Sequence, residues 1–308
     1  MLNSRQYQIK HDTRYEYTNE VIQARHLLHL RPRQSEFQTE LRHSLRIDPA
    51  PTDQVLLRDA FGNEMLHIVI DRPHARLQVS AEMEIALAGR PMPDAKQGIS
   101  WGKLREQLSY TSTPRTRNDL DVLRYRQESP HVKLKNAFRD FAVPSFTDHD
   151  SLMVCAIRLM NNLFETLTYK PGATNTTTPL LEVLEKRHGV CQDYAHLMIA
   201  CLRSMGLPAR YVSGYLRTAP LNPLRDTNRN KPESKLIGAD ASHAWVSVYV
   251  PPFGWIDLDP TNNLVVNMDH ITLGWGRDFS DVSPLRGVIT GGGAHQLIVG
   301  VSVIPVAQ

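Results

Sequence analysis

The sequence has no long hydrophobic run and no apolar leader. No stretch approaches the ~18 apolar residues of a membrane-spanning helix, and the N-terminal residues MLNSRQYQIKHDTRYEY lack the apolar centre of a secretory signal. These absences predict a cytoplasmic protein that does not associate with a membrane.

Cysteine is also scarce. The three cysteines, Cys155, Cys191 and Cys201, are an odd number and do not make a disulfide framework. Their scarcity fits a reducing compartment, where the thiols are free for other chemistry.

Neither sign of charge predominates. The 35 Lys and Arg residues nearly balance the 32 Asp and Glu residues, so no general field draws nucleic acid or anionic membranes to the chain. A local basic cluster between Arg25 and Arg33 alternates with leucines, which is typical of a strand with one solvated face. Nucleic acid is therefore not expected as a partner.

The first part of the chain has the period-two pattern of β-strands. Alternate side chains share one face from Tyr7 to Tyr17 and again from Leu77 to Leu87. Turn-forming residues separate the strands, for example at Asp48 and Pro49. Because 308 residues have room for roughly two domains, residues 1–95 are predicted to form an N-terminal antiparallel β-sandwich-like domain. Residues 96–148 are predicted to be a linker and helical connection.

Helices and then strands follow, which is the order of an α+β domain over residues 149–308. The predicted helices run from Ser151 to Thr168, from Pro179 to Gly189 with Thr178 as N-cap, and from Val190 to Ser204 or Met205 before Gly206. The predicted strands are 209–216, 243–250, 255–259 and 296–304. The polar segment 219–238 is too long for an ordinary connection and is expected to be mobile or functional.

Cys191 lies at the first turn of the third predicted helix. Unpaired backbone N–H groups and the helix dipole favour an anion there, so the position promotes thiolate formation. The same N–H groups could donate to an oxyanion. A cysteine in a helix is more often packed as a small hydrophobe, which is how Cys155 and Cys201 are interpreted.

A predicted β-hairpin, ASHAWVSVYVPPFGWIDLDP, strengthens the catalytic interpretation of Cys191. Folding its arms together brings Asp259 within a few positions of His243, close enough for the carboxylate to reach the imidazole. Such a pair would orient the ring and stabilise the imidazolium that forms when His243 takes the thiol proton.

Three ordered blocks carry a resemblance to a known family. GVCQDYAHLMIACLRSMGLPARYVSGYL, DASHAWVSVYVPPFGWIDLDPTNN and GRDFSDVSPLRG resemble the core of the transglutaminase-like superfamily, in particular bacterial two-domain proteins described as candidate cysteine proteases. The N-terminal part, with LRPR and DAFGN, is similar to the β-domain that precedes that core.

The resemblance implies a papain-like, transglutaminase-like α+β core with a catalytic triad. Cys191 would be the nucleophile, His243 the base and acid, and Asp259, before Pro260, the orienting carboxylate. Asp257 is the rival for that last role. No cofactor is implied, and the acidic loops that bind calcium in animal transglutaminases have no evident counterpart.

Further residues are candidates for substrate binding. Tyr169 could be the second oxyanion donor or a packed aromatic, and Gln192 and Asp193 could be pocket groups or first-turn acceptors. Asp240 could bind a cation on the substrate or be solvated. Trp245 shares the strand face of His243 and is also assigned to the substrate site.

Arg277 and Asp278 could pair with each other or line the cleft. A zinc site is not expected, because Cys191, His196 and Cys201 step by about 140° around a helix and cannot converge on one ion. No metal is therefore assigned.

The function predicted from these residues and this resemblance is hydrolysis of a peptide or isopeptide bond through an acyl-enzyme thioester. Transfer of the acyl group from a protein glutamine to an amine would use the same triad, and a transglutaminase-like domain could also serve as a binding module without turnover. The expected partner is a peptide or protein substrate, and the oligomeric state stays open.

Overall fold

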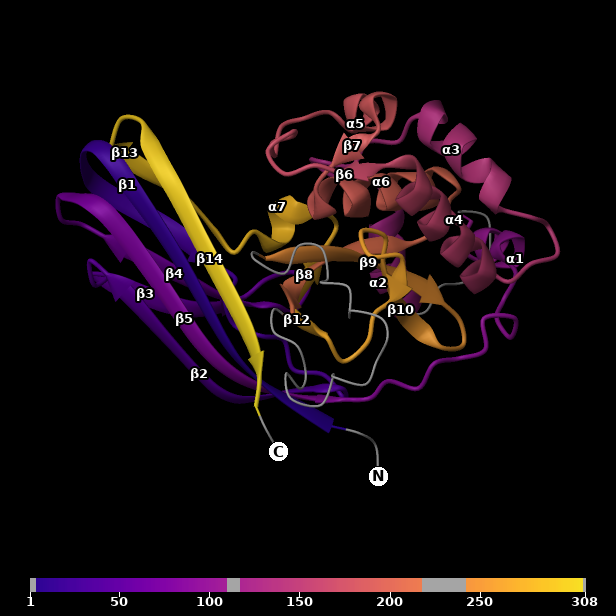
Figure 1. Cartoon of the computed structure of the whole chain (residues 1–308), viewed down its shortest axis with the longest axis horizontal. Coiled ribbons are helices and arrows are strands. Elements are labelled where there is room, and N and C mark those ends of the chain that lie inside the picture. Colours follow the sequence, from indigo (N-terminus) through magenta and orange to yellow (C-terminus); the bar gives the residue numbers. More distant parts are fainter. Residues whose placement is uncertain (1–3, 110–116, 218–241, 307–308) are drawn as a thin grey trace, which may run out of the picture.

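The computed structural model describes residues 4–109, 117–217 and 242–306. A curved β-sheet stands on one side, and a second sheet with helices on its far face makes up the core (Figure 1). The predicted combination of a β-rich N-terminal part with an α+β core is confirmed.

The N-terminal part contributes five antiparallel strands. They are β1 Ser4–Leu28, β2 Gln38–Asp48, β3 Asp53–Arg58, β4 Glu64–Ile70 and β5 His74–Ala88, in the order β2-β5-β1-β4-β3. The long strand β1 is the centre of this sheet. Its side chains alternate between buried and exposed as the period-two pattern predicts.

Two strands from the end of the chain complete the same sheet. β13 Leu285–Gly291 and β14 His295–Pro305 both pair with β1, and Tyr7 lies opposite Pro305. Figure 1 shows β14 beside β1, although the two are far apart in sequence. The sequence prediction had grouped these residues with the core, because alternation identifies a strand but does not identify its partner.

The inner face of the N-terminal sheet packs against the core. Its buried side chains form one cluster with Tyr215, Ile271 and Leu273 from the core sheet. The second layer of the sandwich-like arrangement is thus supplied by the core, and the two parts share an apolar interface.

Short helices join the two parts. They are α1 Trp101–Gln107, α2 Arg117–Leu123, α3 Asn136–Ala142 and the 3₁₀ turns η1 Arg124–Arg126 and η2 Val143–Ser145. Phe138 and Ala142 of α3 are buried in the apolar cluster that also contains α6, so this connection is part of the core.

Three further helices follow. α4 Leu152–Thr166 begins at Ser151, whose side chain accepts from the backbone N–H of Val154. α5 Leu180–Lys186 is shorter than predicted, because Arg187 takes a left-handed conformation and His188–Gly189 form strand β7 beside β6 Thr168–Tyr169. α6 Cys191–Ser204 ends before Gly206, which has φ +81°.

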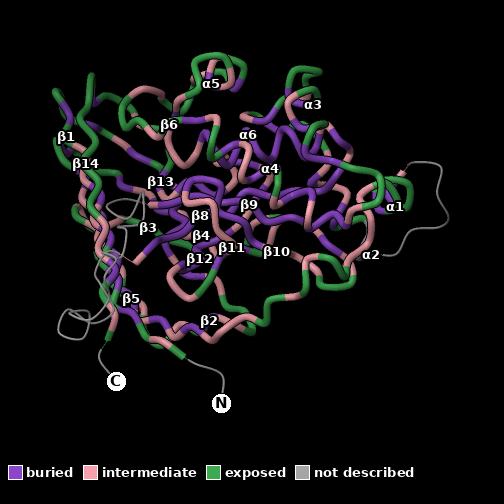
Figure 2. Tube along the Cα trace, turned by 45° about the vertical axis from the view of Figure 1, so that its right-hand side comes forward, coloured by how far each residue is buried: buried purple, intermediate pink, exposed green. Residues whose placement is uncertain are grey.

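The core sheet has the order β11-β10-β9-β8-β12. Its strands are β8 Ala209–Leu216, β9 His243–Val250, β10 Gly254–Asp259, β11 Leu264–Val265 and β12 His270–Gly276, and α7 Phe279–Val282 follows. Buried residues concentrate where α6 meets β8 and β9 (Figure 2). None of the helices in the described ranges is long and apolar enough to cross a membrane.

Candidate active site

Cys191 is the first residue of α6 and is partly exposed, whereas Cys155 and Cys201 are fully buried. The backbone N–H groups of Cys191 and Gln192 have no partner among the described residues, since no helical turn precedes them. The site therefore has an accessible thiol next to two available N–H donors.

Asp193 fixes the start of this helix. Its Oδ2 atom accepts from the backbone N–H of Val190 at 2.8 Å and from the Thr174 hydroxyl at 2.6 Å. Burial raises the pKa of Asp193, while these hydrogen bonds oppose the shift. A Cβ atom on Gly189 would lie 2.7 Å from Asp193, so only glycine fits. Asp193 is thus a first-turn acceptor, and Gln192 is left as the partly exposed polar neighbour.

His243 and Asp259 meet through the hairpin of β9 and β10. Leu258 pairs with Val246, so the next residue, Asp259, lies diagonal to His243. The Nε2 atom of His243 lies 2.8 Å from Asp259 Oδ2, and both side chains are buried. The Nδ1 atom of His243 has no hydrogen-bond partner with oxygen or nitrogen in the described part of the chain and is free to face the thiol.

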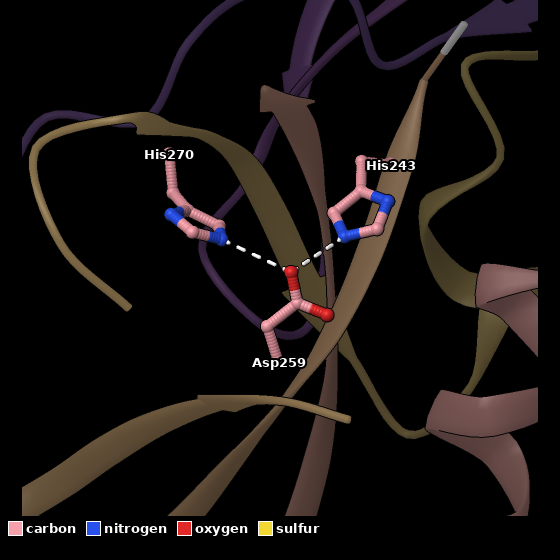
Figure 3. Close-up of side chains that lie close together, drawn as sticks. All are labelled: His243, Asp259 and His270. Carbon is pink, nitrogen blue, oxygen red and sulfur yellow. Dashed lines mark hydrogen bonds and ion pairs between the residues drawn. The ribbon is translucent and has the colours of Figure 1, made fainter. Parts of the chain in front are cut away.

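The Asp259 carboxylate receives five hydrogen bonds from described residues. Oδ1 accepts from the backbone N–H groups of Thr261 and Asn262 at 3.0 and 3.2 Å. Oδ2 accepts from Asn262 Nδ2. It also accepts from His243 Nε2 and, at 3.1 Å, from His270 Nε2 (Figure 3). The turn after Asp259 therefore folds back onto its carboxylate and holds it in place.

His270 was missed by the sequence analysis. It is the first residue of β12, at the far edge of the sheet from β10, and packs edge-on against Trp245 with ring centroids 5.3 Å apart. No local pattern links it to Asp259. Only the pairing of β12 with β8 brings it there, and this pairing is not visible in the sequence.

The ionisation of the pair is strongly coupled. Burial alone would lower the pKa of His243, but Asp259 and, after it, Cys191 raise that pKa to about 10. Burial alone would raise the pKa of Asp259, but His243 and His270 hold it well below the usual range. The arrangement therefore favours the imidazolium, in which His243 holds the proton that the thiol gives up.

Tyr211 is a second neighbour that the sequence analysis missed. Its ring is buried on β8, in the apolar cluster against which Cys191 packs, and burial raises the pKa of its hydroxyl well above the ordinary value, with a smaller contribution from Cys191. Tyr211 and Val212 alternate between the two faces of the sheet, with Tyr211 on the side of α6. This alternation is visible in the sequence and could have predicted that Tyr211 faces the helix of Cys191.

Asp257, the predicted rival of Asp259, points to another partner. Its Oδ2 atom lies 2.7 Å from Arg90 Nη1, and no described contact joins it to His243. The structure thus separates the two carboxylates by their partners, with Asp259 bound to imidazoles and Asp257 to a guanidinium.

The predicted contact between Trp245 and a substrate is not supported, because this side chain has no exposed surface and packs with Val212 and Val266. Tyr169 pairs with Gly189, two residues before Cys191, and is partly buried. Asp240 and the predicted loop 219–238 lie outside the described residues.

Arg277 and Asp278 do not pair with each other. Arg277 binds Asp281 at 2.9 Å, while Asp278 caps α7 and accepts from the backbone N–H of His131. Both side chains are held by neighbours within this part of the core, so their contacts are structural.

One group of possible metal ligands occurs in the described ranges, namely His243, Asp259 and His270. Both imidazole Nε2 atoms hydrogen-bond to the same carboxylate oxygen. The atoms that would coordinate an ion are thus bonded to one another, and the group fits a hydrogen-bonded cluster better than a metal centre.

Comparisons with known proteins agree with this architecture. Residues 146–260 match the model of the transglutaminase-like superfamily, and residues 7–86 match that of the bacterial transglutaminase-like N-terminal region. An uncharacterized protein of Mycobacterium tuberculosis is 36% identical over 97% of this chain and 92% of its own length. A protein-glutamine gamma-glutamyltransferase of Pseudomonas aeruginosa is 29% identical over 50% of this chain but only 19% of its own length.

A solved structure has the same fold. The crystal structure of a candidate cysteine protease from Cytophaga hutchinsonii matches with a TM-score of 0.72 and 19% identity, covering 99% of this chain and 92% of that one. At this identity the likeness extends to the fold of both parts and their arrangement.

Proposed function

Because this chain belongs to the transglutaminase-like superfamily, we propose that it performs thiol-dependent acyl chemistry on an amide or isopeptide bond. Cys191 is the nucleophile, His243 the base and acid, and Asp259 the orienting carboxylate. The observation that carries the proposal is the buried His243–Asp259 hydrogen bond of 2.8 Å, and Cys191 also contributes to the raised pKa of that imidazole.

The reaction follows from these positions. His243 takes the thiol proton, and the Cys191 thiolate attacks the carbonyl carbon, forming a C–S bond while the carbonyl oxygen becomes an oxyanion. When the oxyanion collapses, the C–N bond breaks and His243 returns its proton to the leaving amine. Water or an amine then resolves the thioester and restores the thiol.

The oxyanion needs donors close to Cys191. The backbone N–H groups of Cys191 and Gln192 meet this need because neither has another partner in the described ranges. Tyr211 competes with the predicted Tyr169 as a further donor, because it packs in the same cluster as Cys191 and its raised pKa keeps the hydroxyl proton. Replacing each by Phe would show which of them lowers turnover without changing thiol reactivity.

Hydrolysis of a peptide or isopeptide bond is our preferred reaction, and amine transfer is the alternative. The name of the Pseudomonas aeruginosa relative favours transfer, whereas the description of the Cytophaga hutchinsonii protein favours proteolysis. The substrate in either case is a peptide or protein. The cytoplasmic location stays a prediction.

A direct test uses intact-mass spectrometry with acyl and amide probes, including p-nitrophenyl acetate. We expect one acyl adduct, located on Cys191 and absent from Cys191→Ala, while the buried Cys155 and Cys201 stay unmodified. A glutamine peptide incubated with and without a fluorescent primary amine then separates the reactions. Ammonia release without amine incorporation indicates hydrolysis of the side-chain amide, whereas cleavage of a peptide or isopeptide bond is seen as two fragments in the mass spectrum.

The non-catalytic alternative predicts a different result. A Cys191 that reacted with iodoacetamide no faster than an ordinary thiol across the pH range would contradict the enzyme proposal. So would a Cys191→Ala variant that kept the protein's full biological effect, because a binding module does not need the thiol.

A further inference from the structure

A cavity of about 780 Å³ lies between the N-terminal part and the core. Its walls come from the segment after β1, from the segment after β5, and from β8, β10 and β12. Neither Cys191 nor His243 lines it. Its size and its mixture of aromatic and charged walls suit a small ligand, and interfaces between domains commonly form such sites.

Arg210 is a buried charge in this wall, with 8% of its surface exposed, the same fraction as Asp257. Its guanidinium lies between two aromatic rings, 4.3 Å from the centre of Trp255 and 3.8 Å from the centre of Trp275. Arg33 stacks on Trp275 at 3.5 Å. The planar group is therefore held rigidly by cation–π contacts at the edge of an empty volume.

No carboxylate of the described residues forms an ion pair with Arg210, and its Nε atom is covered yet has no hydrogen-bond partner. The nearest acid, Asp257, is paired with Arg90 at 2.7 Å. Burial lowers the pKa of Arg210 to about 10, partly offset by Asp257 and the Tyr125 hydroxyl, so the side chain keeps its charge at neutral pH. A buried charge without a counter-ion is costly and rare.

We propose that this cavity binds a carboxylate attached to an apolar or aromatic body, with Arg210 as the counter-ion and the rings of Phe37, Trp255 and Trp275 packing against the body. The charged lining residues are three arginines, Glu36 and Asp257, a net charge of +1. This balance suits a monoanion better than a phosphate dianion. The inference does not depend on the chemistry of Cys191.

Two sources could supply the carboxylate, a free organic acid or the C-terminus of a peptide. The cavity can be tested with phenylacetate by calorimetry and by the fluorescence of the two lining tryptophans. We expect binding at about 1 mM or tighter for a ligand of this size. Phenylacetamide, which has the same shape without the charge, is expected to bind at least about tenfold more weakly.

Peptides then identify the source. Gly-Gly-Phe with a free C-terminus, compared with its amide, should bind more tightly than phenylacetate when the natural ligand is a peptide end, and no more tightly when it is a free acid. Either outcome supports a carboxylate site. Equal binding of acid and amide, no binding of phenylacetate at about 10 mM, or its displacement by inorganic phosphate would overturn the proposal.

Variants locate the site. Arg210→Met should weaken phenylacetate binding about tenfold or more, and Arg90→Gln should weaken it as well, because Asp257 is then free to pair with Arg210. The Arg90 variant also covers the case in which Arg210→Met fails to fold. Arg124→Gln is the matched control, since Arg124 faces Phe61 outside this cavity. Unchanged affinity in Arg210→Met would refute the assignment.

Discussion

Asp259 and Arg210 lie on strands of the same sheet and are both more than nine-tenths buried, yet their charges have very different surroundings. Asp259 receives five hydrogen bonds from described residues. Arg210 is held by aromatic faces and lacks a paired carboxylate. A buried charge whose hydrogen bonds are all made within the protein, such as Asp259, holds neighbouring side chains in place. A buried charge without a paired carboxylate, such as Arg210, can still bind a ligand of opposite charge.

The largest expected effect concerns the hydrogen-bonded pair of His243 and Asp259. His243→Ala should slow acylation of Cys191 by p-nitrophenyl acetate by about 100-fold or more, because the base beside the thiol is lost. Released nitrophenolate measures the rate. His188→Ala is the matched control, since His188 precedes Cys191 by three residues without contacting Asp259, and its rate should stay within about threefold of wild type.

The next prediction compares how the charges of Asp259 and Arg210 contribute to the free energy of unfolding. Asp259→Asn should lower the free energy of unfolding by about 2 to 4 kcal/mol, because it leaves a buried cationic network without its anion. Arg210→Met keeps the stem between the rings and removes an unpaired charge, so its change should stay within about 1 kcal/mol. Urea unfolding measures both. A larger loss in Arg210→Met than in Asp259→Asn would reverse the comparison.

The dependence of stability on pH tests how strongly Asp259 stabilises the charged form of His243. The pKa of His243 is raised from 6.5 to about 10, so its contribution is full below pH 6.5 and is lost as the pH rises through about 10. In Asp259→Asn the largest cause of this rise is gone. We therefore expect the free energy of unfolding to fall by at least about 1 kcal/mol more in wild type than in the variant over this range.

His270 should have a moderate effect as a positioning residue. His270→Asn removes one of the five donors to Asp259, because its amide is too short to reach the carboxylate, so acylation should slow about tenfold while Cys191 still forms the adduct. His270→Gln is the companion variant, because its amide nitrogen can take the place of Nε2 and keep the hydrogen bond, so its rate should stay closer to that of wild type. A rate in His270→Asn equal to that of wild type would leave His270 with a packing role only.

The smallest effect is expected for Asp257→Asn. Asp257 pairs with Arg90 and not with His243, so the acylation rate should stay within about threefold of wild type. Binding of phenylacetate should strengthen in this variant, since a competing acid next to Arg210 is neutralised. A 100-fold loss of acylation would instead make Asp257 the orienting carboxylate.

The parts that the sequence predicted well are local ones. The third helix, its end at Gly206 and the pairing of β9 with β10 depend on periodicity, a helix stop and a short loop, all readable within some twenty residues. The meeting of His243 with Asp259 followed from that hairpin. The likeness to a known core added which carboxylate to prefer.

The parts that the sequence did not predict depend on long-range packing. Alternation correctly put Trp245 on the His243 face, but its burial depends on Val212 and Val266 from other strands. His270 and Arg210 acquire their roles only when β8, β10 and β12 assemble. Residues that act through a neighbour distant in sequence have no local signature.

The pairing of β1 with β14 has a consequence for biosynthesis. Tyr7 lies opposite Pro305 and Tyr17 opposite His295, so one long edge of β1 can be covered only after residues 295–305 have left the ribosome. The segment that carries Cys191 is made before that moment and can begin to fold first. During translation the open edge of β1 is a place where two nascent chains could pair with each other.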